Sequence, residues 1–412
     1  MKVLVISQHF WPETMPINDL ANDLHAAGID LTILTGQPNY PAGKVFSGYR
    51  ALNVMTERHP AGYPIQRVPL TPRGSGSGWR LAVNYLSFIA STCLLGPLLF
   101  RGRRFDVIFV FGSSPILQAL AGIALKRQVG AALVTWVQDL WPQSLEATGF
   151  VRNRRILRVV GLVVGWIYRR TDLLLVQSRA FLDPVRRMAG ATPVIYHPNP
   201  GDAASEALVG NDNGLRLESG FTVLFAGNLG TVQALDTILD AAEQVRHAAD
   251  IRFVLVGSGS RGEWLRGEIQ RRGLTNVTVP GRFPPAAMSA LFAQASALLV
   301  SLNRNPILSL TIPSKVQTYL AAGRPIIAAL DGEGARVVVE AGAGIACPAE
   351  DPVALAAAVL TLRAASPAER EFMGAAGRAY HARHFSSAML TERLIGHFRT
   401  VAARRPRWAC AN

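Results

Sequence analysis

Lys315 is the residue whose type and setting point most directly to chemistry. The chain has four lysines against 38 arginines, and no lysine other than Lys315 follows Lys126. It lies in TIPSKVQTYLAAGRPIIAA, where Pro313 and Ser314 predict the start of a helix. A compact ammonium at a helix start suits phosphate as a point charge, whereas arginine would impose a broad fork. Lys315 is therefore expected to bind phosphate; the alternative is a solvated surface lysine.

Two glycine loops follow apolar runs and precede helical patterns. Gly227-Asn228-Leu229-Gly230 stands in FAGNLGTVQALDTILDAA, and GSGSRG begins at Gly257. Such loops let backbone N–H groups and the positive end of a helix approach phosphate oxygens. The first loop is expected to bind a phosphate, although a tight turn alone would also explain its two glycines.

The GSGSRG stretch matches the dinucleotide-binding pattern G-x-G-x-x-G. An NAD site also needs an acidic residue about 20 positions further on, after the next strand, to hold the ribose. That strand is NVTVPGRF, which ends in Pro280-Gly281-Arg282 and offers no carboxylate. Dinucleotide binding is therefore not expected.

Aromatic and acidic residues occur together in two loops of the first half. His9, Trp11 and Glu13 follow the first apolar run, and Asp139 and Trp141 follow a later one. Ligands of open parallel sheets bind at the carboxyl ends of the strands. An aromatic ring beside a carboxylate can stack on a sugar and bind its hydroxyls, so these five residues are candidates for a sugar site. Local packing is the alternative for each of them.

The elements that must position these residues alternate between strands and helices. Strands are expected at 2–7, 30–35, 106–111, 131–137 and 172–178, and again at 221–227, 251–257, 276–281, 297–302 and 325–330. This alternation predicts two Rossmann-like, doubly wound α/β domains with a cleft between them. We place the first domain at 1–200, a Gly/Asn/Asp/Ser-rich linker at 201–220, the second domain at 221–385, and a terminal helix and tail at 386–412.

Charge and composition limit the classes of function. Residues 1–200 hold 21 Lys and Arg against 10 Asp and Glu, whereas residues 201–412 hold 21 against 18. The basic first half implies an anionic partner: nucleic acid, phospholipid or a phosphorylated substrate. With 49% hydrophobic residues, wholesale disorder is excluded. The three cysteines form no metal or disulfide pattern, no secretory signal precedes the first strand, and no Asp-x-Asp or His/Cys cluster predicts a metal.

Two apolar segments raise the question of membrane contact. Residues 81–100 are long enough to span a bilayer but contain Asn84, Thr92 and Pro97. The segment is predicted to form either a buried helix or a helix that lies at the membrane interface. Residues 151–172 place an apolar run, too short to span, between groups of arginines, which fits an interfacial element on anionic lipid or a core helix with solvated ends. Peripheral association is expected, not spanning.

The motifs taken together carry a family resemblance. SQHFWPE at 7–13, NYPAGK at 39–44, VQDLWPQ at 137–143, AGNLG at 226–230 and PSKVQTYLAAGRPIIA at 313–328 resemble the retaining glycosyltransferases of family 4. The chain is most similar to the bacterial subgroup that builds O-antigen, capsule and colanic-acid-type polysaccharides, including fucosyl and N-acetylfucosaminyl transferases. The resemblance runs over nearly the whole chain, and its motifs are specific for the family and much less so for the sugar.

The resemblance implies a GT-B fold, with a nucleotide diphosphate-sugar, UDP- or GDP-linked, in the second domain and the acceptor in the first. No further cofactor or metal is implied. The residues it places at the donor are Gly227, Asn228, Leu229, Gly230, Gly257, Gly281, Arg282, Arg304, Pro313, Ser314, Lys315, Thr318 and Glu333. Lys315 and Arg282, with Asp139, are the expected catalytic residues. His9, Trp11, Glu13, Asp139 and Trp141 are expected to bind the acceptor.

The chain departs from the family pattern at several positions. Family members commonly carry two glutamates where this chain has Leu310 and Thr318. An Arg and a Lys usually occupy the positions of Asn228 and Gln233, and His often precedes Asp139 where this chain has Gln138. Arg304 and Glu333 are the expected replacements for the missing charge and the missing sugar contact.

The sequence thus predicts a cytoplasmic enzyme on the inner face of the plasma membrane. It would transfer a sugar, with retention of configuration, to a lipid-linked saccharide in cell-surface polysaccharide biosynthesis. Two alternatives remain open: a nucleotide-sugar 2-epimerase of the same fold, and a non-catalytic basic binding protein. Nucleic acid is not expected as a partner, because the sequence has no interleaved Arg and aromatic residues.

Overall fold

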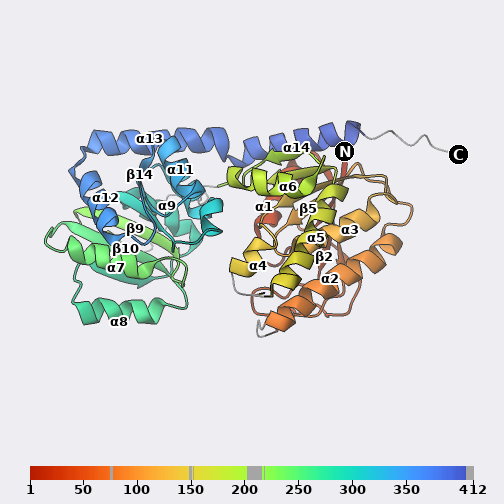
Figure 1. Ribbon diagram of the computed structural model, residues 1–412, viewed down its shortest axis with the longest axis horizontal. Coiled ribbons are helices and arrows are strands. Elements are labelled where there is room, and N and C mark those ends of the chain that lie inside the picture. The colour runs from red at the N-terminus through yellow and green to blue at the C-terminus, as the bar shows by residue number, and fades with distance from the viewer. Residues whose placement is uncertain (75–77, 148–150, 152, 202–215, 218, 405–412) are drawn as a thin grey trace. The chain divides into compact units, whose positions relative to one another are not determined.

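The computed structural model divides into two compact units, each built on one sheet (Figure 1). It describes residues 1–74, 78–147, 151, 153–201, 216–217 and 219–404. Unit 1 comprises Met1–Pro198 together with Leu390–Asn412, and unit 2 comprises Asn199–Met389. Most of the predicted linker 201–220 and the end of the tail, 405–412, lie outside the described residues.

Unit 1 contains an eight-stranded sheet in the order β3-β4-β2-β1-β5-β6-β7-β8, in which the β3–β4 pair is antiparallel and the other pairs are parallel. Its strands are β1 Lys2–Ile6, β2 Asp30–Gly36, β3 Met55–Arg58, β4 Pro64–Val68, β5 Val107–Gly112, β6 Ala132–Val137, β7 Leu173–Val176 and β8 Val194–Tyr196. The helices are α1 Pro16–Ala26, α2 Gly78–Leu99, α3 Ala119–Leu125, α4 Gln143–Ala147, α5 Arg154–Arg170 and α6 Leu182–Ala189. The central strands β5 and β6 are buried throughout, as strands covered by helices on both faces must be.

Unit 2 has a fully parallel six-stranded sheet in the order β11-β10-β9-β12-β13-β14. The strands are β9 Phe221–Asn228, β10 Ile251–Ser258, β11 Val277–Gly281, β12 Ala297–Ser301, β13 Ile326–Ala329 and β14 Gly344–Cys347. The helices are α7 Leu235–Gln244, α8 Gly262–Arg272, α9 Pro285–Gln294, α10 Ser314–Ala322, α11 Glu333–Glu340, α12 Pro352–Ala364 and α13 Pro367–His384. Separate apolar clusters fill the two faces of this sheet.

The last helix, α14 (Ser387–Ala403), belongs to unit 1 over most of its length. Leu394 and Phe398 are completely buried in the core that lies between α1 and the sheet of unit 1. The ring of Phe398 lies 5.3 Å from that of Phe109 on β5. Unit 1 is therefore made from the two ends of the chain (Figure 1).

Helix α2 buries polar as well as apolar residues on one side and exposes large apolar residues on the other. Asn84 and Thr92 are completely buried, and Asn84 bonds with Gln8 through its Oδ1 and with the Thr71 carbonyl through its Nδ2. Trp79, Leu94 and Leu98 are 67%, 72% and 69% exposed. Residues 81–100 therefore do not form the buried core helix that was one of the two expectations.

Candidate donor site and acceptor-side residues

A cavity of about 490 Å³ lies in unit 2 where β9, β10 and β11 end and α10 begins. Its position at the carboxyl ends of parallel strands is where open α/β sheets bind ligands. Its volume falls in the usual range for small-molecule sites. Seven residues predicted for the donor line it: Gly227, Asn228, Gly257, Arg282, Ser314, Lys315 and Thr318.

Lys315 lies on the first turn of α10, and its ammonium is held against apolar surface. Nζ is 4.4 Å from the centroid of the Phe225 ring, and burial lowers the pKa of the amine from 10.5 to about 8. Within the described residues no hydrogen bond or ion pair engages Nζ. A desolvated cation without a counter-charge is stabilised by an anion entering the cavity.

Two glycines make room for this ammonium. Gly227 ends β9 with a φ of +142°, and a Cβ there would lie 2.5 Å from the Lys315 Cε. Gly257, its partner in the β9–β10 register, has a φ of +147°. A side chain at Gly227 would displace the lysine from the floor of the cavity. Gly227 is thus required by the approach of Lys315 to the sheet, and Gly257 by the approach of the Gly227 backbone.

The main-chain amides of the first glycine loop are only in part available to a ligand. The Leu229 N–H donates to the Ser258 carbonyl at 2.9 Å, and the Gly230 N–H donates to Gln233 Oε1 at 3.1 Å. The amides of Leu229 and Gly230 therefore hold the loop in shape. Asn228 lines the cavity and is the residue of this loop best placed to contact a phosphate.

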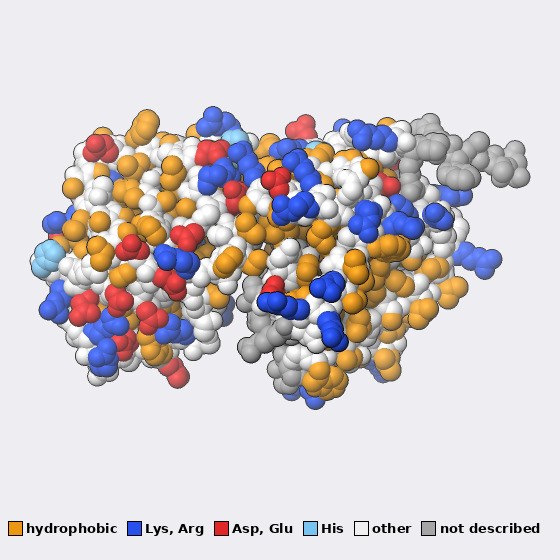
Figure 2. Space-filling model, in the orientation of Figure 1, with side chains coloured by type: hydrophobic (Ala, Val, Ile, Leu, Met, Phe, Trp, Pro, Cys, Tyr) orange, Lys and Arg blue, Asp and Glu red, His pale blue; other side chains and the backbone are white. Residues whose placement is uncertain are grey.

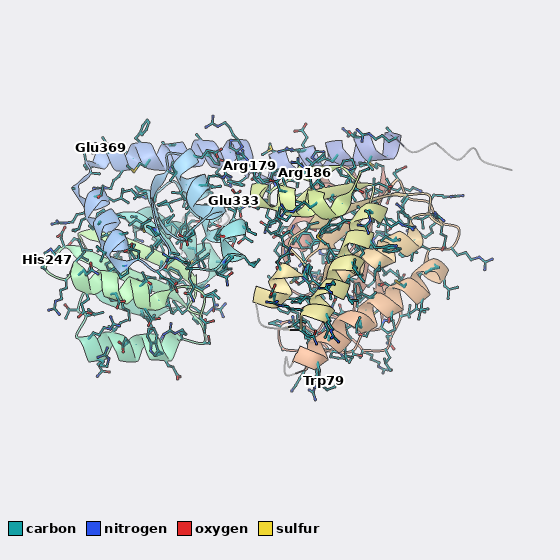
Figure 3. The ribbon with its side chains drawn as sticks, viewed as in Figure 1. Trp79, Arg179, Arg186, His247, Glu333 and Glu369 are labelled. Atoms are coloured by element: carbon teal, nitrogen blue, oxygen red, sulfur yellow. The ribbon has the colours of Figure 1, made fainter. Side chains whose placement is uncertain are left out.

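Several predicted donor residues lie outside the lining of the cavity. Arg304 donates to the Ala349 carbonyl at 2.8 Å and pairs with Asp331 at 3.5 Å. Glu333 begins α11 and pairs with Arg336 at 2.8 Å (Figure 3). The remaining predicted residues that do not line it are Leu229, Gly230, Gly281 and Pro313.

Apolar residues complete the cavity wall, and sequence reasoning missed them. Phe283 follows β11, Met288 and Phe292 lie on α9, and Tyr319 lies on α10 one turn after Lys315. The Tyr319 hydroxyl bonds to the backbone of Ala226, which fixes α10 against the end of β9. In sequence these residues look like ordinary core positions, so no signal distinguished them.

Unit 1 carries a buried His–Glu pair after β1. Glu13 is 2% exposed, and its carboxylate accepts from the backbone N–H groups of Phe10, Asn39 and Tyr40. The same carboxylate lies 3.0 Å from His9 Nδ1. Glu13 thus joins the loop after β1 to the loop after β2. Because its carboxylate is occupied by these contacts, its role is to position the two loops.

The tryptophans of unit 1 are also engaged by the protein. Trp141 is 6% exposed and donates its Nε1–H to the Ser114 hydroxyl at 3.0 Å. Trp11 packs edge-on against His59, with ring centroids 5.3 Å apart. Asp139, by contrast, is half-buried at the carboxyl end of β6. The pKa of the Tyr85 hydroxyl is raised, chiefly by burial, and the nearby Asp139 charge adds to that rise. Among the predicted acceptor residues, Asp139 is the one whose side chain the described contacts leave most available to bind a ligand.

Two protein-family models match the chain, one over each unit. Residues 16–200 match the glycosyl transferase 4-like domain, and residues 220–364 match the glycosyl transferases group 1 model. The chain belongs to the group 1 glycosyltransferases. Its two parallel-sheet units form the GT-B fold, as predicted. This enzyme family assignment excludes the alternative of a non-catalytic basic binding protein.

Curated relatives and a solved structure agree with this assignment. The glycosyltransferase WbjE of Pseudomonas aeruginosa is 27% identical over 270 residues, which cover 62% of this chain and 66% of that protein, just under two thirds. WcaI of Escherichia coli, named as a colanic acid biosynthesis glycosyl transferase, is 26% identical over 339 residues, 78% of this chain and 82% of that protein. The structure of HepE from Anabaena, in complex with UDP and glucose, superposes with a TM-score of 0.65 at 16% identity, covering 97% of this chain and all of HepE.

Proposed function

We propose that this glycosyltransferase takes its sugar from a nucleotide diphosphate-sugar held in the cavity of unit 2. The observation that carries the proposal is the desolvated ammonium of Lys315 on the cavity floor, which pairs with none of the residues that the structure describes. Arg282, exposed at the mouth of the same cavity, supplies a second positive charge. The apolar wall formed by Phe283, Met288 and Phe292 suits a base or a sugar face. UDP is the first donor nucleotide to test, because HepE binds it.

The proposed reaction retains the anomeric configuration of the sugar by front-face displacement. The bond from the anomeric carbon to the diphosphate oxygen breaks, and a bond to an acceptor hydroxyl oxygen forms on the same face. The leaving diphosphate takes the hydroxyl proton. Lys315 and Arg282 would stabilise the charge that develops on the phosphate, as groups fixed in place before reaction do. Asp139 would orient the acceptor in unit 1.

The proposed acceptor is a lipid-linked saccharide in cell-surface polysaccharide biosynthesis, reached from the cytoplasmic face of the membrane. Within the described ranges α2 is long and apolar enough to span a bilayer, on length and composition alone, and 28% of its apolar window is buried. On α5, Ile156, Val159 and Leu162 are 49%, 59% and 66% exposed. Hydrophobic side chains gather over α2 and α5 with Lys and Arg among them (Figure 2). This surface favours peripheral association with an anionic membrane.

The donor proposal is tested by measuring melting temperatures in the presence of UDP, GDP and their sugars, because a ligand of the folded state raises Tm. One nucleotide should raise Tm and its sugar should be transferred to a lipid-linked acceptor, with the anomeric configuration of the product read by NMR. Release of an epimerised nucleotide-sugar without acceptor would favour the epimerase instead. Absence of any shift would remove the donor assignment.

A further inference from the structure

A second cavity, of about 300 Å³, lies in unit 1 and is lined mainly by cations. Lys126 and Arg127 follow α3, Arg169 and Arg170 end α5, and Asp172 precedes β7. Asp172 accepts from the Leu133 N–H at 2.7 Å, which places the cavity where β6 and β7 begin. His9 and Asp139 follow the opposite ends of strands in the same sheet. The cavity is thus separate from the predicted acceptor residues.

The charges in this cavity are not balanced by its own carboxylate. Lys126 Nζ lies 3.2 Å from the Asp172 carboxylate, so the charges of Lys126 and Asp172 neutralise one another. Lys126 Nζ also donates to the Arg170 carbonyl oxygen at 2.6 Å. Arg169 donates to the Met188 carbonyl at 3.2 Å, which does not reduce its charge. In the described part of the chain no carboxylate pairs with Arg127, Arg169 or Arg170. Three arginines thus line one concavity, and a concavity lined by arginines suits a phosphate.

The cavity continues the exposed apolar face of α5. Arg170 lies over the ring of Trp166, 5.1 Å from its centroid, and Trp166 is 40% exposed. Trp166 follows Ile156, Val159 and Leu162 along the same outward side of the helix. A tryptophan between an apolar surface and a group of cations is typical of the level of lipid headgroups.

We propose that this cavity binds the phosphate of an anionic phospholipid headgroup while the apolar face of α5 enters the acyl region. This site adds a membrane-binding element to the proposed function. It rests on that function in one respect, because it assumes that the acceptor lies in a membrane. Free phosphate offers the same chemistry, but it would leave the adjoining apolar face without a partner. The cavity would fix unit 1 on the bilayer by a defined site in addition to general charge attraction.

The test compares two double variants with the same change in net charge. Arg127→Ala with Arg170→Ala removes two cavity cations, and Arg246→Ala with Arg266→Ala removes two exposed arginines from unit 2. Co-sedimentation with vesicles of equimolar phosphatidylglycerol and phosphatidylcholine should fall at least about tenfold for the cavity variant, and less than about twofold for the control. Equal losses in the two variants would overturn the site. Arg127→Lys with Arg170→Lys keeps the charge and should retain binding if the fold is intact.

Inorganic phosphate distinguishes the two sources of the anion. If phosphate raises Tm in the parent chain and not in the cavity variant while vesicle binding is unchanged, the site takes soluble phosphate and the lipid proposal fails. Loss of vesicle binding by the cavity variant alone supports it. The UDP-induced shift in Tm, measured on the same variant, should persist, because the donor cavity lies in unit 2. Failure of the donor proposal would remove that shift from every variant and from the parent chain.

Discussion

A Cβ on Gly257 would lie 1.8 Å from the carbonyl oxygen of Gly227, its partner on the adjacent strand. The contact is with backbone, so no side chain can move aside. Gly257→Ala should lower the free energy of unfolding by about 2–4 kcal/mol and displace the strand ends that line the donor cavity. Urea unfolding followed by circular dichroism measures the first effect, and the UDP-induced shift in Tm measures the second.

Gly267 provides the matched control for Gly257. It lies inside α8, and a Cβ there would meet nothing within 4 Å. Gly267→Ala should therefore stabilise the helix by about 0.5–1 kcal/mol without changing UDP binding. If Gly257→Ala behaved like this control, the close approach of the two strand ends would not constrain the site.

Lys315→Met should separate stability from ligand binding. Burial holds the pKa of the amine down at about 8, so the charged form is disfavoured in the unliganded protein. An apolar chain of similar length should raise the free energy of unfolding by about 1–2 kcal/mol and abolish the UDP-induced shift in Tm. A variant that kept the full shift would remove Lys315 from the site.

Donor affinity should depend on pH in a direction set by Lys315. The anion binds the protonated amine, whose pKa in the free protein is about 8. Affinity for UDP should therefore be constant near pH 7 and fall as the pH rises through about 8, approaching tenfold per unit. Calorimetric titrations in buffers across this range measure the slope. Lys315→Arg, which does not lose its proton, should give a flat profile.

Glu13→Ala should destabilise unit 1 and leave the donor site intact. Its carboxylate accepts from three backbone N–H groups and contacts His9, and of these partners Phe10, Asn39 and His9 are buried with it. Removing the carboxylate should lower the free energy of unfolding by about 2–4 kcal/mol, while the UDP-induced shift in Tm persists. Glu146→Ala, an exposed site on α4, should change stability by less than about 0.5 kcal/mol. If the two variants lost similar free energy of unfolding, the hydrogen bonds of Glu13 would not stabilise unit 1.

Most strands with continuous apolar runs were predictable, but the short strands β8 (VIY) and β14 (GIAC) were not among those expected. The ten strands expected from 2–7 to 325–330 all correspond to strands in the structure. The β3–β4 pair was missed because its sequences, MTER and PIQRV, are short and mixed with charge. Arg67 in β4 is completely buried and donates to the Gly36 carbonyl at 2.9 Å. An arginine buried by tertiary partners looks like a loop residue in sequence.

The candidate donor site was predictable where a residue's chemistry was unusual in its context. Lys315, Arg282 and Gly257, which the sequence predicts at the donor, line the cavity. Glu333 was chosen to fill a position that the family pattern left open, but its carboxylate pairs with Arg336 three residues along α11. Sequence spacing alone did not reveal this local ion pair. The same limit applies to Trp141, whose burial depends on contacts with a distant loop.

The return of α14 to unit 1 has a consequence for synthesis of the chain. Leu394, Ile395, Phe398 and Val401 complete a core whose other buried members lie before residue 176. A ribosome releases these residues after those of unit 2, so the first half of the protein emerges with an open apolar strip where α14 will pack. The second half can close its own core earlier. The part of the enzyme that is translated first is therefore the part that finishes folding last.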